Sequence, residues 1–259
     1  MQASGTVSLV GAGPGSPDLI TVRGLRRLRE ADVVVYDALI HPGLLAEIHP
    51  DAERVYAGKR GYCVGSTLQE TICDVLVDRA RQGLRVVRLK GGDPCVFGRG
   101  GEEAEHLAER GIPFEIVPGV TTAVGACAAA NIPLTHRDAG QSVALITGHF
   151  DPESPDCTHD WAALAKMSAL VVYMGLRHLD AIAAKLIDAG MDPFTPAAVI
   201  ANATLPNQIV IRSPLSLIAA EAAGMPAPAI LVIGEVTAKP QAVREALAVS
   251  RRTRTEDYQ

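Results

Sequence analysis

The sequence predicts an α/β fold, and three observations carry that prediction. Short β-branched runs alternate with helical patterns along nearly all of the 259 residues. Several of these runs are continuously apolar, as strands covered by helices on both faces are. With 48% hydrophobic and only 4% aromatic residues, the chain can bury a sizeable and mainly aliphatic core. Length and pattern together are typical of an α/β protein.

The predicted elements follow one another through both halves of the chain. The clearest helix runs over residues 66–81, where Ser66 and Gln69 have capping-box spacing and one face is apolar. A second helix is expected to begin near Glu102, and a further strand is expected before Gly58. The other strands are predicted at residues 7–10, 33–36, 86–89, 143–147, 170–173, 198–201 and 230–233.

The sequence divides near its middle, at Pro118-Gly119. The glycine-rich loops lie mostly before this point, so we expect residues 1–118 to form an N-terminal α/β domain. Residues 122–238 are expected to form a second α/β domain. The tail, 239–259, is expected to hold a short helix and then fray.

Composition excludes several classes of function. The 24 basic and 29 acidic residues give a formal charge of −5, which offers no global attraction to nucleic acid or an anionic membrane. The five cysteines never approach C-x-x-C spacing, and the seven histidines lack a metal-ligand pattern, so no metal is expected. No run of eighteen apolar residues and no basic-then-apolar leader occurs, which predicts a cytoplasmic protein.

The most informative segment is residues 89–102, Leu-Lys-Gly-Gly-Asp-Pro-Cys-Val-Phe-Gly-Arg-Gly-Gly-Glu. It joins a predicted strand to a predicted helix and contains five glycines, whereas an ordinary tight loop needs one or two. That much backbone freedom favours a loop that a ligand approaches closely.

Two other loops invite different interpretations. Residues 11–17, Gly-Ala-Gly-Pro-Gly-Ser-Pro, partly resemble a dinucleotide-binding turn, but Ser16 stands where the pattern needs glycine or alanine and Pro14 lacks a backbone donor. Residues 61–65 fit the pattern of a hydrolase elbow with Cys63 as the nucleophile. The residues before this segment are polar and flexible, so a cysteine hydrolase is only a remote alternative.

Charged residues follow several predicted strands. Asp37 ends one strand and Lys59 follows another, so both are expected at the carboxyl edge of one sheet, where α/β proteins bind ligands. A carboxylate and an amine brought together there can accept and donate protons. Arg99 and Arg137 flank the expected interdomain cleft, and guanidinium groups suit carboxylate recognition.

Seven segments in order together resemble the uroporphyrinogen-III C-methyltransferases, and the resemblance covers nearly the whole chain from residue 7 to 235. The most specific are Arg-Leu-Lys-Gly-Gly-Asp-Pro at 88–94 and Phe-Gly-Arg-Gly-Gly-Glu-Glu at 97–103. The others lie at residues 10–15, 35–37, 58–60, 117–121 and 132–137.

The resemblance implies two α/β domains of the tetrapyrrole methylase type (class III methyltransferases) with an active-site cleft between them, usually in a homodimer. It implies C-methylation of uroporphyrinogen III at C2 and C7, giving precorrin-2 via precorrin-1. The methyl donor would be S-adenosyl-L-methionine, which leaves as S-adenosyl-L-homocysteine. By position, Asp37 and Lys59 match the proton acceptor and donor, and Arg99, Glu102 and Arg137 would hold the tetrapyrrole, with Arg99 also placed among the catalytic residues. The positions that match cofactor contacts are Pro14, Gly91, Gly92, Asp93, Val96, Thr121, Thr122, Met174, Ala203 and Ala229.

Three departures from the family pattern concern the expected cofactor site. Cys95 replaces the usual phenylalanine, Thr122 replaces a smaller residue, and residues 201–204 read Ala-Asn-Ala-Thr. None removes a proposed catalytic group. A methyltransferase acting later in corrin synthesis and a non-catalytic tetrapyrrole-binding protein remain alternatives. No appended dehydrogenase–ferrochelatase domain is recognised, so a stand-alone methyltransferase is expected.

Overall fold

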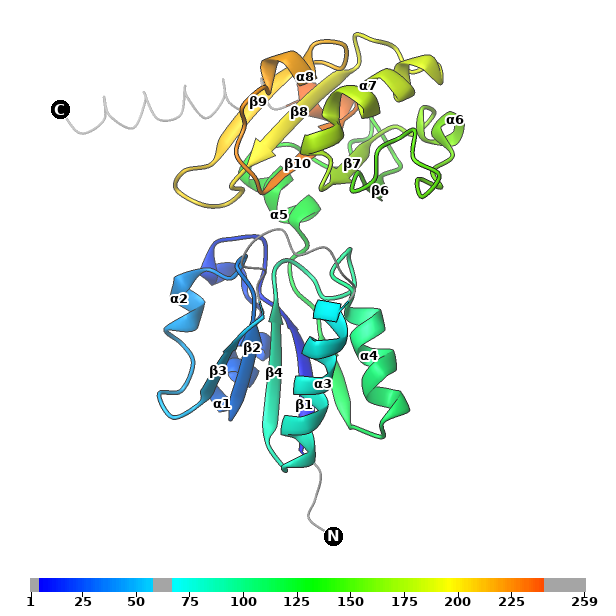
Figure 1. Cartoon of the computed structure of the whole chain (residues 1–259). Coiled ribbons are helices and arrows are strands. Elements are labelled where there is room, and N and C mark those ends of the chain that lie inside the picture. The colour runs from blue at the N-terminus through cyan, green and yellow to red at the C-terminus, as the bar shows by residue number, and fades with distance from the viewer. Residues whose placement is uncertain (1–4, 58–66, 240–259) are drawn as a thin grey trace, which may run out of the picture. The chain divides into compact units, whose positions relative to one another are not determined.

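The structure is a computed structural model that describes residues 5–57 and 67–239 (Figure 1). The chain forms two compact units, residues 1–122 (unit 1) and 123–259 (unit 2). Each unit contains one five-stranded sheet with helices packed against it, so the α/β prediction is confirmed.

Unit 1 alternates strands and helices along the sequence. Its elements are β1 (Thr6–Gly11), η1 (Pro17–Leu19), α1 (Val22–Glu30), β2 (Val33–Tyr36), α2 (Pro42–Leu45), β3 (Glu53–Tyr56), α3 (Thr67–Arg81), β4 (Arg85–Lys90), α4 (Gly100–Glu109) and β5 (Phe114–Val117). The strand order is β3-β2-β4-β1-β5, and every pair is parallel.

Alternate residues of the unit 1 strands point to opposite faces, and each face has its own apolar cluster. Val34 packs with residues of α1 and α2, whereas its neighbours Val33 and Val35 pack with residues of α3 and α4. Both faces of the sheet are therefore covered, which explains why the central strands read as continuous apolar runs.

Unit 2 combines parallel and antiparallel pairs. Its elements are α5 (Thr122–Ala129, whose first residue belongs to unit 1), β6 (Ala144–Thr147), α6 (Trp161–Leu164), β7 (Leu170–Tyr173), η2 (Leu176–His178), α7 (Leu179–Asp188), β8 (Pro196–Ala201), β9 (Ile209–Pro214), α8 (Ile218–Glu221), β10 (Ala229–Ile233) and η3 (Glu235–Ala238). The order is β6-β7-β10-β8-β9, in which only β6 and β7 are parallel. Helices α6, α7 and α8 pack on one face, and α5 packs on the other.

All seven delimited strand predictions match observed strands to within two residues at each end. β5 and β9 were not predicted, and β3 was expected only as an undelimited strand before Gly58. All three are edge strands, each hydrogen-bonded to a single neighbour. An edge strand buries less of its surface and carries more polar residues, so its apolar signal is weaker.

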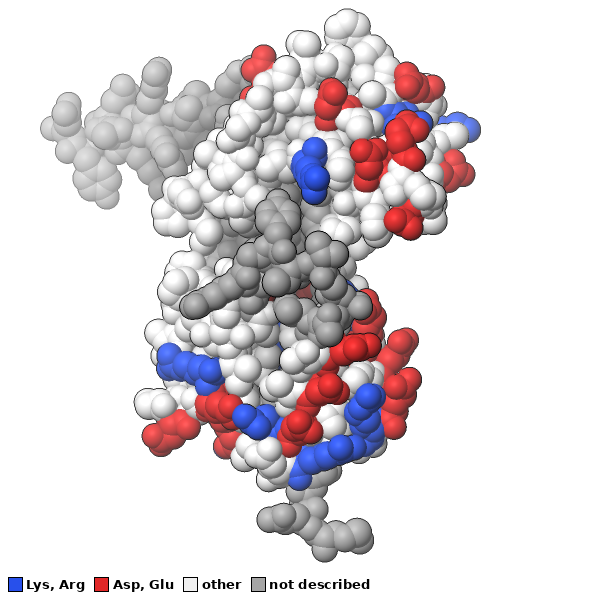
Figure 2. Space-filling view, in the orientation of Figure 1, with Lys and Arg blue, Asp and Glu red and all other residues white. Residues whose placement is uncertain are grey.

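Charges of both signs are interspersed over the part of the unit 1 surface that Figure 2 shows. Among the described residues, no helix has the length and apolar character needed to cross a membrane.

Candidate functional site

The carboxyl edge of the unit 1 sheet gathers the loops that the sequence singles out. Because all five strands are parallel, the residues that follow β1, β2, β4 and β5 emerge at the same edge. Asp37 follows β2, the glycine-rich loop follows β4, and Thr121 and Thr122 follow β5. These segments therefore share one sheet edge, whereas the expectation that Asp37 meets Lys59 there concerns a residue outside the described part of the chain.

Three glycines allow the loops at this edge to touch one another. A Cβ on Gly119 would lie 2.2 Å from the carbonyl oxygen of Gly92, and a Cβ on Gly11 would lie 2.6 Å from the Cα of Gly119. Gly92 also exchanges two backbone hydrogen bonds with Gly13, at 2.7 and 3.2 Å. The loop after β4 is thereby fixed against the loops after β1 and β5, which places Pro14 beside the glycine-rich segment.

Gly92 faces the start of α5. It has a φ of +66°, and a Cβ at this position would lie 3.4 Å from the hydroxyl oxygen of Thr122. A residue with a side chain is strained in this backbone conformation. The structure therefore brings together the predicted cofactor residues Gly91 and Gly92 with Thr121 and Thr122.

Asp93 organises this loop through both carboxylate oxygens. Oδ1 accepts the backbone N–H of Cys95 at 2.8 Å, and Oδ2 accepts the N–H of Gly119 at 3.0 Å. Val96 continues the turn by donating its N–H to the Asp93 carbonyl oxygen. Asp93 thus holds two loops in place, and its contact with a cofactor stays a prediction.

Arg99 and Glu102 form an exposed ion pair at the start of α4. Arg99 Nε lies 3.0 Å from both carboxylate oxygens of Glu102, and the two side chains are 54% and 55% exposed. The hydrogen bonds from Arg99 lower the pKa of Glu102, and those to Glu102 raise the pKa of Arg99. These two of the three predicted tetrapyrrole-binding side chains are therefore accessible, with the guanidinium already paired to a carboxylate.

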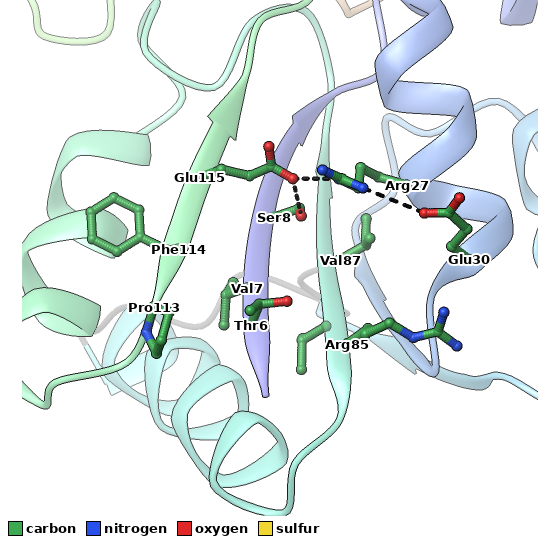
Figure 3. A pocket seen from close by; sticks show the side chains of 11 residues that line it. Thr6, Val7, Ser8, Arg27, Glu30, Arg85, Val87, Pro113, Phe114 and Glu115 are labelled. Atoms are coloured by element: carbon green, nitrogen blue, oxygen red, sulfur yellow. Dashed lines mark hydrogen bonds and ion pairs between the residues drawn. The ribbon is translucent and has the colours of Figure 1, made fainter. Parts of the chain in front are cut away.

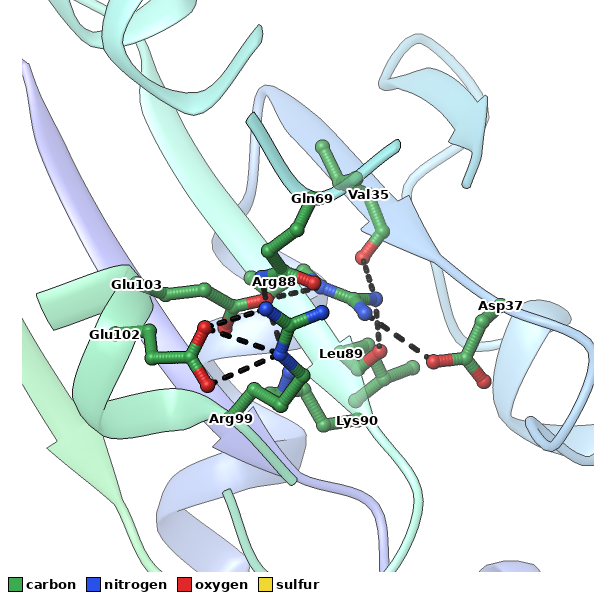
Figure 4. Close-up of polar contacts among 9 residues, drawn as sticks. All are labelled: Val35, Asp37, Gln69, Arg88, Leu89, Lys90, Arg99, Glu102 and Glu103. Carbon is green, nitrogen blue, oxygen red and sulfur yellow. Dashed lines mark hydrogen bonds and ion pairs between the residues drawn. The ribbon is translucent and has the colours of Figure 1, made fainter. Parts of the chain in front are cut away.

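Asp37 is joined to a buried ionic cluster, which Figure 4 shows. Its Oδ2 accepts a hydrogen bond from Arg88 Nη2 at 3.2 Å, and its Oδ1 accepts the N–H of Leu39 at 3.0 Å. The Asp37 side chain is 24% exposed, whereas Arg88 is 5% exposed. A buried guanidinium therefore holds a partly accessible carboxylate at the sheet edge, as a proton acceptor requires.

The cluster beneath Asp37 centres on Glu103, which is completely buried. Its Oε1 accepts hydrogen bonds from Lys90 at 2.9 Å, Gln69 at 3.1 Å and Arg88 at 3.2 Å. Oε2 has no hydrogen-bond partner among the described residues. Burial lowers the pKa of Lys90 and neighbouring Arg88 lowers it further, while Glu103 opposes the shift.

Sequence reasoning did not single out Arg88, Lys90 or Glu103 as a functional group. The available signal was two basic residues inside the otherwise apolar run 86–90, since a charge in a buried strand needs a partner. Glu103 is indistinguishable by sequence from the exposed Glu102 beside it.

Two sequence hypotheses fall on residues outside the described part of the chain. Lys59, the predicted proton donor, and Cys63, the nucleophile of the remote hydrolase alternative, both belong to residues 58–66. The predicted capping residue Ser66 lies in the same range.

Arg137, the third predicted tetrapyrrole-binding residue, lies in unit 2 and is exposed. It follows His136, which forms an isolated antiparallel β-bridge with Gly140.

The unit 2 sheet also gathers predicted cofactor residues at one edge. Ala229 pairs with Ala201, and Ile230 pairs with Tyr173, so the ends of β7 and β8 meet the start of β10. Met174, Ala203 and Ala229 therefore lie at the same end of this sheet.

The backbone at that edge is unusual. Met174, Asn202 and Thr204 have φ values of 55°, 48° and 68°, in the left-handed region. Such non-glycine residues concentrate at ligand sites. The Tyr173 hydroxyl accepts the N–H of Ala123 at 2.8 Å, which fixes the first turn of α5 against this edge.

A pocket of about 290 Å³ lies elsewhere, at the amino ends of β1, β4 and β5 (Figure 3). Its charges are already paired: Glu115 accepts hydrogen bonds from Ser8, at 2.9 Å, and from Arg27. None of the predicted site residues lines this pocket. Among the described residues, no group of three or more His, Cys, Asp or Glu side chains is arranged to hold a metal ion.

Comparison with known proteins gives a consistent result. Residues 6–219 match the family model of the tetrapyrrole (corrin/porphyrin) methylases. The siroheme synthase of Neisseria meningitidis serogroup A is 52% identical over 233 residues, which are 90% of this chain and 47% of that protein. The chain therefore spans about half the length of the curated relatives it matches.

Solved structures match over nearly their whole length. Uroporphyrin-III C-methyltransferase from Thermus thermophilus, complexed with S-adenosylhomocysteine, superposes with a TM-score of 0.76 and 38% identity, covering 90% of this chain and 93% of that one. A cobalt precorrin-4 methyltransferase superposes with a TM-score of 0.78 and 32% identity, covering 90% and 95%.

Proposed function

Because this chain belongs to the tetrapyrrole (corrin/porphyrin) methylase family, we propose that it transfers methyl groups from S-adenosyl-L-methionine to uroporphyrinogen III. Methylation at C2 gives precorrin-1, and methylation at C7 then gives precorrin-2. The relatives named siroheme synthase and uroporphyrin-III C-methyltransferase support this substrate.

One observation carries the proposal. The carboxyl edge of unit 1 presents Asp37, the backbone of Gly91–Asp93 and the side chain of Arg99 together, on loops that interlocking glycines hold in place. A partly accessible acid, a loop segment with two adjacent glycines and an exposed guanidinium meet the three needs of methylating a carboxylate-bearing ring. These needs are a proton acceptor, a cofactor cradle and an anion contact.

The residues at both sheet edges suit the cofactor. Gly91 and Gly92 have no side chains to obstruct a ligand, and we propose that they hold the methyl donor together with Pro14, Asp93, Val96, Thr121 and Thr122. In unit 2, Ala203 and Ala229 carry small side chains at the sheet edge, and Met174 is 49% exposed. A flexible, polarisable methionine side chain suits contact with the cofactor.

The proposed reaction breaks a carbon–sulfur bond and forms a carbon–carbon bond at a pyrrole carbon. S-adenosyl-L-methionine supplies the methyl group from its sulfonium. Such a displacement depends on alignment and exclusion of water more than on a strong base. One proton leaves the macrocycle for each methyl group added, and we propose Asp37 as its acceptor with Lys59 as the complementary donor.

Uroporphyrinogen III carries eight carboxylates. Because the net charge of this protein is negative, individual basic residues at the site must bind them. Arg99 and Arg137 are exposed basic residues, and we propose that they bind these carboxylates. Glu102 would orient Arg99, since its carboxylate already receives the guanidinium. We also propose a homodimer in the cytoplasm, in keeping with the family resemblance.

Anaerobic incubation with uroporphyrinogen III and S-adenosyl-L-methionine, followed by mass analysis, tests the proposal. Two added methyl groups, with two equivalents of S-adenosyl-L-homocysteine, are expected. No added methyl group on uroporphyrinogen, with transfer to a precorrin instead, would assign the chain to a later methyltransferase of the same family. Tight binding of uroporphyrinogen without any methyl transfer would indicate a non-catalytic binding protein.

A further inference from the structure

The loop between β4 and α4 contains two strained residues. Among the described residues of unit 1, Phe97 and Arg99 are the only non-glycine residues with positive φ, at 52° and 59°. This conformation costs roughly 1–2 kcal/mol for a residue with a side chain and is a clear outlier for a bulky one. Strain of this kind persists where the surroundings enforce it, and such residues cluster at ligand sites.

The surroundings that enforce it are the carbonyl groups of the preceding turn. A Cβ on Gly98 would lie 2.7 Å from the Pro94 carbonyl oxygen, and a Cβ on Gly100 would lie 2.4 Å from the same atom. Gly100 also donates its N–H to that oxygen at 2.9 Å. The two glycines therefore pack onto Pro94. Arg99 lies between them and Phe97 directly precedes them, so both residues belong to the same closed turn.

Both side chains remain accessible. Phe97 is 39% exposed although aromatic residues are usually buried, and the Arg99 side chain is 54% exposed. A second exposed apolar side chain at this sheet edge is Leu39, which is 60% exposed and lies over Gly91. The loop thus presents an aromatic ring two residues from a guanidinium, on the sheet edge that also bears Asp37.

We propose that Phe97 is a specificity-determining contact for the tetrapyrrole, and this inference rests on the proposed function. The acceptor combines apolar pyrrole rings with carboxylate side chains at every ring. The Phe97 ring packs against a pyrrole while Arg99 binds a carboxylate on the same ring, so the pair favours acceptors that combine an apolar ring with an acidic substituent over those that lack either. On this proposal, the backbone strain at both positions is retained because it positions the two side chains for the same ring of the acceptor.

Four variants separate this role from a structural one. Phe97→Ala removes the ring, Phe97→Leu keeps an apolar contact, and Phe97→Gly removes both the ring and the strain. Phe114→Ala is the matched control, because Phe114 is 38% exposed but lies at the start of β5, at the opposite end of the sheet. For each variant, the KM for uroporphyrinogen III, the affinity for S-adenosyl-L-homocysteine and the Tm are measured.

Loss of the ring in Phe97→Ala should raise the KM for uroporphyrinogen about ten- to a hundredfold, with cofactor affinity within twofold of wild type. Phe97→Leu should recover most of the loss. Phe97→Gly should show the same KM defect with a Tm that is unchanged or a few degrees higher, because glycine adopts positive φ without strain. A residue kept only for stability would instead lower the Tm without moving the acceptor KM.

A Phe97→Ala or Phe97→Gly KM within twofold of that of Phe114→Ala would overturn the inference. Inactivity of the wild-type enzyme toward uroporphyrinogen would count against the proposed function alone. In that case, fluorescence titration with the oxidised octacarboxylate uroporphyrin III decides the inference. Equal dissociation constants for wild type and Phe97→Gly would then reject it.

Discussion

Replacing Glu103 by glutamine tests whether the buried cluster beneath Asp37 stabilises unit 1. The carboxamide keeps the size of the side chain and removes its charge. Arg88 and Lys90, which are 5% and 6% exposed, would then share only the partly exposed carboxylate of Asp37 as a counter-charge. The glutamine amide would also replace one carboxylate oxygen, which accepts hydrogen bonds, by an NH₂ group, which donates them and can point toward Arg88 and Lys90.

The expected loss follows from the burial of all three groups. Removing one partner of a buried ion pair costs about 3–5 kcal/mol, because a desolvated charge is left uncompensated. For a protein of this size each kcal/mol corresponds to roughly 2–4 °C in Tm, so Glu103→Gln should lower the Tm by about 6–20 °C. Glu102→Gln provides the control, since that side chain is 55% exposed and an exposed pair contributes at most about 1 kcal/mol.

Thermal unfolding followed by circular dichroism at pH 7 measures both variants. A Glu103→Gln loss no larger than that of Glu102→Gln would refute the reasoning that the cluster stabilises the fold. The pH dependence gives a second check. The pKa of Lys90 already lies below its usual 10.5, so folding favours the neutral amine and stability rises as pH increases toward 10.5. Without Glu103, which opposes the shift, the pKa of Lys90 should fall further. The difference in Tm between Glu103→Gln and wild type should therefore narrow between pH 7 and pH 9.5.

Three further substitutions, the last with a matched control, address the site. Asp93→Ala should weaken S-adenosyl-L-homocysteine binding, measured by calorimetry, and unchanged affinity would remove Asp93 from the cofactor site. Arg99→Ala should impair the tetrapyrrole step by about 2–5 kcal/mol, the scale of a lost charge contact, and wild-type turnover at limiting uroporphyrinogen would contradict this role. Gly119→Ala should destabilise unit 1 by roughly 1–3 kcal/mol, the cost of overpacking a filled site, because the added Cβ would clash with the Gly92 carbonyl oxygen. Gly101→Ala is the control, because Gly101 lies in α4 and a Cβ there would have nothing within 4 Å; this variant should raise the Tm. Equal Tm changes for Gly119→Ala and Gly101→Ala would show that the close approach of Gly119 to Gly92 is unimportant for stability.

Central strands and the loops that follow them could be predicted from sequence because burial on two faces leaves an uninterrupted apolar run. β2 and β7 match the predicted ranges at both ends. β5 and β9 could not be recognised, since each lies at a sheet edge and mixes polar with apolar residues. The placement of Asp37 at the carboxyl edge of the sheet followed from its position at the end of a strand and needed no knowledge of side-chain contacts.

The ionic cluster could not be predicted in the same way. Arg88 and Lys90 are two residues apart and therefore point to the same face of a strand, but their meeting with Glu103 depends on where α4 packs. Nothing in the local sequence distinguishes a glutamate turned into the core from one turned toward solvent. The strain at Phe97 was equally hidden, because the local sequence does not show that Gly98 and Gly100 pack onto the Pro94 carbonyl group.

The position of β1 between β4 and β5 has a consequence for how unit 1 folds. Val7 pairs with Val86 on one side and with Phe114 on the other, so β1 gains its neighbours only after most of unit 1 has been synthesised. Pairing across such long sequence separations is slow, because the chain loses the entropy of closing a large loop before any strand contact stabilises it. In unit 2, by contrast, β8 and β9 are joined by a short connection and pair locally. The junction of Gly11, Gly92 and Gly119 is therefore a late step of folding, and the ligand-binding edge of unit 1 takes shape only when its sheet is complete.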